Sequence, residues 1–67
     1  MPTWRSRFNE LSTAQAKALD EVKSANSKAQ RSAAISKVKT TMEDISSFLK
    51  KYESAGMPDH DAPMPND

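Results

Sequence analysis

Two stripes of apolar residues constrain this chain more than any other feature, because they cannot share one face of a single helix. Each stripe has helical spacing, and at about 100° per residue the two lie roughly 160° apart on a continuous helix. The first stripe consists of Trp4, Phe8, Leu11, Leu19 and Val22. The second stripe consists of Ile35, Val38, Met42, Ile45, Leu49 and Tyr52. A turn between the stripes would let them face each other.

An antiparallel hairpin would pair the two stripes in a nearly constant register. In such a hairpin the numbers of facing residues add up to a constant, because one number rises as the other falls. The total is 56 for Trp4 with Tyr52 and for Leu11 with Ile45. It is 57 for Phe8 with Leu49, Gln15 with Met42, Leu19 with Val38 and Val22 with Ile35. The sequence therefore predicts an all-α fold, an antiparallel two-helix hairpin.

Local signals place the first helix at about residues 4–24. Thr3 is a suitable N-cap for a helix that begins at Trp4. A later start is the alternative, because Ser12 and Gln15 have the spacing of a capping box. We favour the early start because it keeps the first apolar stripe continuous.

The turn is expected at about residues 25–27, inside a polar segment that extends from Ser24 to Ser32. Ser and Asn side chains in this segment compete with helical backbone hydrogen bonds. The segment holds no Gly or Pro, however, and several of its residues are good helix formers. One long continuous helix is therefore the alternative to the hairpin.

The second helix should cover about residues 28–54, with Ala34 and Phe48 widening its apolar stripe. Gly56 fits the position just after a helix C-terminus, and Pro58 prevents the helix from continuing. The sequence thus predicts that the helical hairpin ends at about residue 56.

The C-terminal segment, residues 57–67, differs in composition from the rest of the chain. It is rich in Pro and Asp and has little apolar surface to bury. Such a segment cannot offset the entropy lost on ordering. The prediction is a disordered acidic tail that follows a hairpin formed by residues 1–56.

Composition predicts a thin core that needs association. The chain has 67 residues, of which 36% are hydrophobic, and it has no cysteine. Domains of this size usually add disulfides, a metal or oligomerisation. We expect a coiled-coil or bundle-type complex, in which the partner is either a second copy or a helical subunit of a larger assembly. The expected core and partner-binding residues are Trp4, Phe8, Leu11, Leu19, Val22, Ile35, Val38, Met42, Ile45, Phe48, Leu49 and Tyr52.

No catalytic motif is present, and we predict a protein that is not an enzyme and needs no cofactor or metal. The single histidine, His60, lies in the predicted tail, so a folded nucleophile and base arrangement that uses histidine has nowhere to form. Asp59, His60 and Asp61 are the one cluster of metal-ligand residue types. A mobile tail would give that cluster neither fixed geometry nor further ligands.

A run of basic residues around the expected turn supports a second interpretation. No acid lies between Glu21 and Glu43, whereas five basic residues do: Lys23, Lys28, Arg31, Lys37 and Lys39. They could contact a polyanion such as nucleic acid through the phosphates. Binding would be weak and nonspecific, because no aromatic residue lies among these cations to stack on bases.

Peripheral contact with a membrane surface is a further alternative, in which Trp4 and Phe8 beside Arg5 and Arg7 act as an interfacial anchor. The chain lacks a run of about 18 apolar residues, so no transmembrane segment is predicted. It also lacks the apolar region of a secretory signal at its start. We therefore expect a soluble or peripheral protein, and the leading interpretation is a small structural subunit that docks its apolar stripes onto itself or onto a larger assembly.

Overall fold

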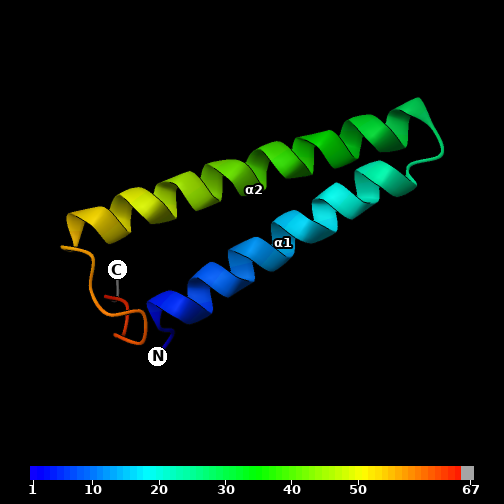
Figure 1. Cartoon of the computed structure of the whole chain (residues 1–67). Helices are drawn as coiled ribbons and strands as arrows, with labels where there is room; N and C mark the ends of the chain where they lie inside the picture. The colour runs from blue at the N-terminus through cyan, green and yellow to red at the C-terminus, as the bar shows by residue number, and fades with distance from the viewer. Residues whose placement is uncertain (66–67) are drawn as a thin grey trace.

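Two antiparallel helices form the fold in this computed structural model, which describes residues 1–65. Helix α1 spans Trp4–Ser24 and helix α2 spans Lys28–Ser54. They lie side by side in a rod with extents of 43 × 17 × 16 Å (Figure 1). The predicted all-α hairpin is confirmed. The alternative of one continuous helix is wrong, because the chain reverses direction at residues 25–27.

Side chains at the turn supply hydrogen-bond partners for the first turn of α2. Ser27 is the N-cap of this helix, and its Oγ accepts a hydrogen bond from the backbone N–H of Gln30 at 3.2 Å. The Oε1 atom of Gln30 in turn accepts from the backbone N–H of Asn26 at 3.0 Å. This reciprocal arrangement is related to the capping box. It explains how the chain turns without Gly or Pro.

Helix α2 ends in a Schellman motif. The N–H of Gly56 donates to the carbonyl oxygen of Glu53 at 3.0 Å, and the N–H of Met57 donates to that of Tyr52 at 3.1 Å. Gly56 has a φ of 81°, a left-handed conformation that glycine adopts without a steric penalty. The motif stops the helix and directs the following segment back towards α1.

The two helices pack in a register in which facing residue numbers total 56. The ring centroids of Trp4 and Tyr52 lie 5.1 Å apart, and those of Phe8 and Phe48 lie 6.0 Å apart. Both pairs have this total. A cluster of the buried residues Trp4, Leu11 and Phe48 forms the centre of the core, with Ile45 and Tyr52 packed against it. Towards the turn the buried residues are small, namely Ala18 and Ala34.

The buried row of α2 is displaced by one residue from the predicted stripe. Ile35, Met42 and Leu49 are exposed instead of facing α1. The positions that face α1 are instead those one residue earlier. Of these, Ala34 and Phe48 are buried and Thr41 is half-buried. Val38, Ile45 and Tyr52 belong to both patterns, and all three are half-buried in the structure.

The position of Phe48 explains this displacement. Its ring packs 5.5 Å from the ring of Trp4, which is 2% exposed. Because a helix is rigid, turning Phe48 inwards also turns inwards the residues one and two heptads before it, Thr41 and Ala34. The small Ala34 and Ala18 then allow the helices to approach each other near the turn. Phe48 packs against Trp4 at one end and the small Ala18 and Ala34 are buried at the other, while the larger Ile35 is exposed.

Residues 57–65 fold back over the open end of the hairpin, so the prediction of a disordered tail is wrong for this segment (Figure 1). The backbone N–H groups of Trp4 and Arg5 donate to the carbonyl oxygens of Ala62 and His60, at 3.2 and 2.8 Å. These donors belong to the first turn of α1, where backbone N–H groups have no acceptors within the helix. Asn66 and Asp67, also predicted to be disordered, lie outside the described residues.

Apolar contacts and one hydroxyl also hold the C-terminal segment. Ala62 and Met64 pack against the buried cluster around Trp4. The Tyr52 hydroxyl donates to the carbonyl oxygen of Pro58 at 2.6 Å. The segment therefore buries apolar surface and satisfies helix-terminal donors together, which its composition alone does not indicate.

Candidate interaction surface

Five large apolar side chains remain exposed on the hairpin. Their exposed fractions are 41% for Phe8, 46% for Leu19, 53% for Ile35, 56% for Met42 and 45% for Leu49. All five belong to the set that the sequence predicted as core and partner-binding residues. We call these five residues the apolar face.

Heptad spacing places these residues on the same side of the rod. Ile35, Met42 and Leu49 follow one another at seven-residue intervals, so they form a row along α2. On α1, Leu19 lies two heptads after Arg5. Arg5 and Leu49 line the same cavity, so the side of α1 that carries Leu19 adjoins the row on α2. The apolar face thus extends from the open end of the hairpin towards the turn.

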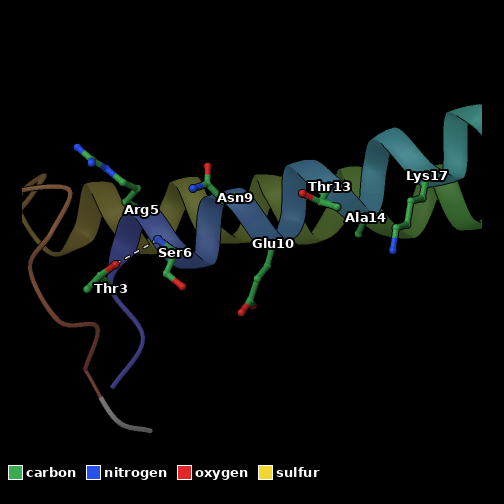
Figure 2. A pocket seen from close by; sticks show the side chains of 8 residues that line it. All are labelled: Thr3, Arg5, Ser6, Asn9, Glu10, Thr13, Ala14 and Lys17. Carbon is green, nitrogen blue, oxygen red and sulfur yellow. Dashed lines mark hydrogen bonds between the residues drawn. The ribbon is translucent and has the colours of Figure 1, made fainter.

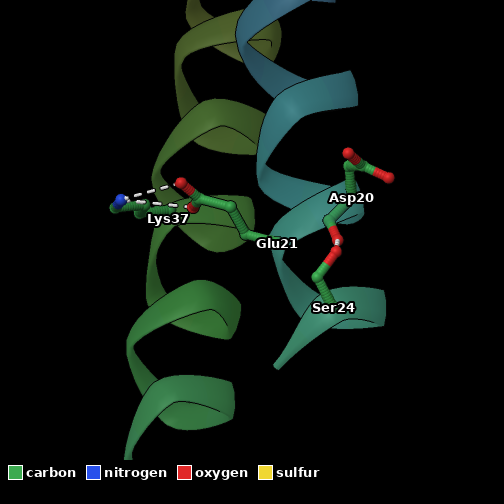
Figure 3. Close-up of polar contacts among 4 residues, drawn as sticks. All are labelled: Asp20, Glu21, Ser24 and Lys37. Carbon is green, nitrogen blue, oxygen red and sulfur yellow. Dashed lines mark hydrogen bonds and ion pairs between the residues drawn. The ribbon is translucent and has the colours of Figure 1, made fainter. Parts of the chain in front are cut away.

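The opposite side of the rod is polar and carries an ion pair between the helices. Lys37 Nζ lies 3.2 Å from Oε2 and 3.3 Å from Oε1 of Glu21 (Figure 3). Both side chains are about half exposed or more, so this pair contributes only about 0–1 kcal/mol to stability. Other positions on this side are Arg7, Asp44 and Lys51, which line one small cavity with Leu11 and Phe48. The two sides of the hairpin therefore differ in chemistry.

An aromatic cavity of about 180 Å³ lies at the open end, next to the apolar face. Its lining consists of Trp4, Arg5, Phe8, Phe48, Leu49, Tyr52 and His60. Cavities that enclose drug-sized ligands have volumes of about 300–1,000 Å³. This aromatic cavity is smaller and suits an apolar side chain rather than a whole small molecule.

The charged groups near the aromatic cavity are engaged elsewhere. Arg5 Nε lies 3.5 Å from Oδ1 of Asp61. The His60 ring stacks on Tyr52 with ring centroids 6.3 Å apart and an interplanar angle of 15°. These contacts leave an opening that is mainly hydrocarbon, which favours an uncharged occupant.

A larger hollow of about 700 Å³ follows the outer surface of α1 (Figure 2). Its lining residues all come from this helix or its N-cap: Thr3, Arg5, Ser6, Asn9, Glu10, Thr13, Ala14 and Lys17. Figure 2 shows these side chains spreading outwards from one helix, with the Ser6 N–H donating to Thr3 Oγ1. Because no second element encloses them, they cannot shield a reaction from water, and we do not assign a chemical role to this hollow.

The five basic residues of the predicted polyanion surface are all exposed. Lys23 lies in the last turn of α1, and Lys28 and Arg31 lie in the first turns of α2, so these three are nearest the turn. Lys37 is neutralised by its ion pair with Glu21. Lys39 lies farther along α2. The set is therefore divided rather than gathered on one basic patch.

Burial contradicts the role of Trp4 in the predicted interfacial anchor. Trp4 is 2% exposed, and its indole packs between the helices instead of projecting outwards.

Neither helix in the described part of the chain has an apolar stretch that could cross a membrane. Within residues 1–65 no group of three His, Asp or Glu side chains could hold a metal ion.

Of the predicted core and partner-binding residues, Trp4, Leu11 and Phe48 are buried, and Val22, Val38, Ile45 and Tyr52 are half-buried. The remaining five form the apolar face. The sequence interpretation missed the interhelical role of Ala18 and Thr41. Their seven-residue spacing from Leu11 and Phe48 is visible in the sequence, but alanine and threonine give a weak hydrophobic signal.

No known protein family, curated protein or solved structure matches this chain. The functional argument therefore depends on the geometry of the hairpin.

Proposed function

We propose that this chain is a small non-catalytic interaction module that docks its apolar face onto another helical surface. The observation that carries the proposal is the segregation of five exposed apolar side chains on one side of the rod, opposite the Glu21–Lys37 ion pair. Scattered apolar residues are normal on a protein surface, but a contiguous apolar patch marks an interaction site.

The small size of the internal core supports this proposal. Within residues 1–65, the large buried side chains are Trp4, Leu11 and Phe48. Full burial of a large apolar side chain contributes about 1.5–3 kcal/mol. Covering the exposed halves of five such side chains would therefore add several kcal/mol, on a scale comparable with the core itself. Docking would complete a bundle that the hairpin only half forms.

Matched triple variants on α2 can test the role of the apolar face. The test variant carries Ile35→Gln, Met42→Gln and Leu49→Gln. The control carries Ser36→Gln, Glu43→Gln and Lys50→Gln, which have the same spacing but lie one residue farther along the chain and are also exposed. Both variants should keep the helical circular dichroism of the monomer, because the test residues lie outside the buried row.

The binding measurement is an NMR titration of the full chain with a synthetic amphipathic helix that presents leucines at heptad spacing. Amide shifts should centre on Phe8, Leu19 and the α2 row, and only the test variant should lose them. Absence of such shifts at millimolar peptide, together with absence of concentration-dependent shifts in the chain alone, would refute the proposal.

A further inference from the structure

We propose that the partner on the apolar face is a second copy of this chain, related by a two-fold axis that crosses α2 at Met42. The inference rests on the proposed function and adds the identity and orientation of the partner. In this arrangement the two α2 helices run antiparallel, and the Leu19 and Ile35 side chains of each copy cover the aromatic cavity of the other. The result is a four-helix bundle.

The positions of the cavity and the apolar pair carry this inference. Leu49, which lines the aromatic cavity, lies seven residues after Met42, and Ile35 lies seven residues before it. Each interval is about 10 Å along a helix. A two-fold rotation about Met42 therefore brings Ile35 of one copy to the level of Leu49 of the other, and the same contact recurs at the opposite end. This self-complementarity is what an isologous interface requires.

The positions of residues on helix α1 are consistent with the same two-fold axis. Leu19 and Arg5 lie seven residues on either side of Ser12. In the hairpin, Arg5 adjoins Leu49 at the aromatic cavity, so Ser12 lies near the level of Met42. The rotation that brings Ile35 of one copy to the level of Leu49 of the other therefore also brings Leu19 of the first copy to the aromatic cavity of the second. Two apolar side chains reach an opening of about 180 Å³.

Charges at the ends of the α2 row favour the antiparallel orientation. Arg31 precedes Ile35 by four residues and Glu53 follows Leu49 by four, so each lies beside the row. Both are exposed, and neither forms an ion pair within residues 1–65. Antiparallel pairing brings Arg31 of one copy to the level of Glu53 of the other at both ends of the row. Parallel pairing would instead oppose like charges.

The area of the face is sufficient for a dimer. The rod measures 43 Å by 17 Å across its broad side, or about 700 Å² in projection, close to the roughly 800 Å² per partner of a standard interface. Most of that broad side would therefore have to be buried in the interface between the two copies. Pairing along the full length of α1 and α2 provides this, whereas a single crossed helix would cover a fraction of it.

Sedimentation equilibrium of the full chain and cysteine crosslinking test the dimer. The chain has no cysteine, so Met42→Cys introduces a unique thiol close to the proposed axis. Glu43→Cys is the matched control, because it is also exposed and lies on the neighbouring position. Treatment with a short bis-maleimide should link Met42→Cys chains into dimers at least ten times faster than Glu43→Cys chains.

Charge reversal gives a second test that does not depend on the cysteine variants. Arg31→Glu and Glu53→Arg should each weaken the dimer several-fold, and the double variant should restore it. A dimer insensitive to the single reversals, or not restored in the double variant, would overturn the antiparallel orientation. So would preferential crosslinking of Ser12→Cys chains to Met42→Cys chains in a mixture, because that pairing requires α1 to face α2 of the other copy.

The outcomes separate this inference from the proposed function. A chain that stays monomeric at millimolar concentration and shows no preference for crosslinking at position 42 overturns self-pairing. If that chain still binds the synthetic amphipathic helix through Leu19 and Met42, the proposed function stands with a different partner. If it binds neither, both proposals fail.

Discussion

The indole of Trp4 meets the phenol ring of Tyr52 edge to face, with ring centroids 5.1 Å apart and an interplanar angle of 73°. This geometry is favoured by the aromatic quadrupoles and contributes beyond simple burial. The two residues come from the first turn of α1 and the last turn of α2. Tyr52 also contacts the C-terminal segment, because its hydroxyl donates to the Pro58 carbonyl oxygen and its ring stacks on that of His60. One aromatic pair thus joins both helices and the segment that covers them.

Tyr52→Phe should loosen the C-terminal segment without dismantling the hairpin. The variant keeps the ring contact with Trp4 but loses the 2.6 Å hydrogen bond to the Pro58 carbonyl oxygen. We expect the free energy of unfolding to fall by about 0.5–1.5 kcal/mol in urea denaturation. Hydrogen exchange at the amides of Trp4 and Arg5 should accelerate. Unchanged exchange at both amides would show that the hydroxyl does not hold the segment.

Met64→Ser should destabilise the hairpin although residue 64 lies outside both helices. Met64 packs against the buried cluster around Trp4, and its N–H donates to the Pro2 carbonyl oxygen. Loss of its side chain should lower the melting temperature and shift the Trp4 fluorescence to longer wavelength, because water gains access to the indole. The control is Met57→Ser, since Met57 is 65% exposed. Equal effects of the two substitutions would contradict the packing of the segment.

A disulfide between Ala18→Cys and Val38→Cys should form within one chain. Their numbers total 56, as in the Trp4–Tyr52 pair, so the two positions face each other across the helix interface. Ala16→Cys with Lys39→Cys is the control, because both positions are exposed. Oxidation of the facing pair should stabilise the monomer by about 3 kcal/mol through loop closure. Crosslinks that appear solely between chains would mean that the hairpin is not the form in solution.

Replacement of Lys23, Lys28 and Arg31 by glutamine should abolish a weak affinity for heparin. These three cations lie nearest the turn, and Lys37 is already paired with Glu21. Retention of the unaltered chain should weaken steeply with salt, because the interaction releases counterions. Helicity should change little, since exposed substitutions usually alter stability by less than about 0.5 kcal/mol. Submicromolar affinity at physiological salt, lost in the triple variant, would make polyanion binding the leading function.

The hairpin could be predicted from the sequence because two independent patterns agree. The helical spacing of the two stripes favours a turn over one continuous helix, and the nearly constant total of the expected pairs favours an antiparallel arrangement. The pairs that contain Ile35, Met42 and Leu49 are nevertheless not facing pairs in the structure. Local chemistry added the N-cap at Thr3 and the stop at Gly56, both of which depend on groups within a few residues along the chain. Such short-range features are encoded within a few residues and need no knowledge of the rest of the chain.

The choice between two adjacent rows on α2 required the tertiary structure. Ile35 and Ala34 belong to overlapping patterns of the same period, and hydrophobicity alone favours Ile35. The difference is a rotation of α2 by about 50°, half the angle of one residue, because Val38, Ile45 and Tyr52 belong to both patterns. It places Phe48 against Trp4 and buries Ala34. The apolar face is the consequence, because this rotation leaves Ile35, Met42 and Leu49 exposed.

The sequence by itself determined two helices, their direction and the boundaries between them, since periodicity and capping are local properties. The tertiary structure alone decided which apolar residues are buried, which remain exposed, and that the segment of residues 57–65 packs against the cluster around Trp4. A polar, proline-rich segment becomes ordered here because α1 presents unpaired N–H donors and an aromatic cluster at the same end. Those groups come together only after the hairpin has formed.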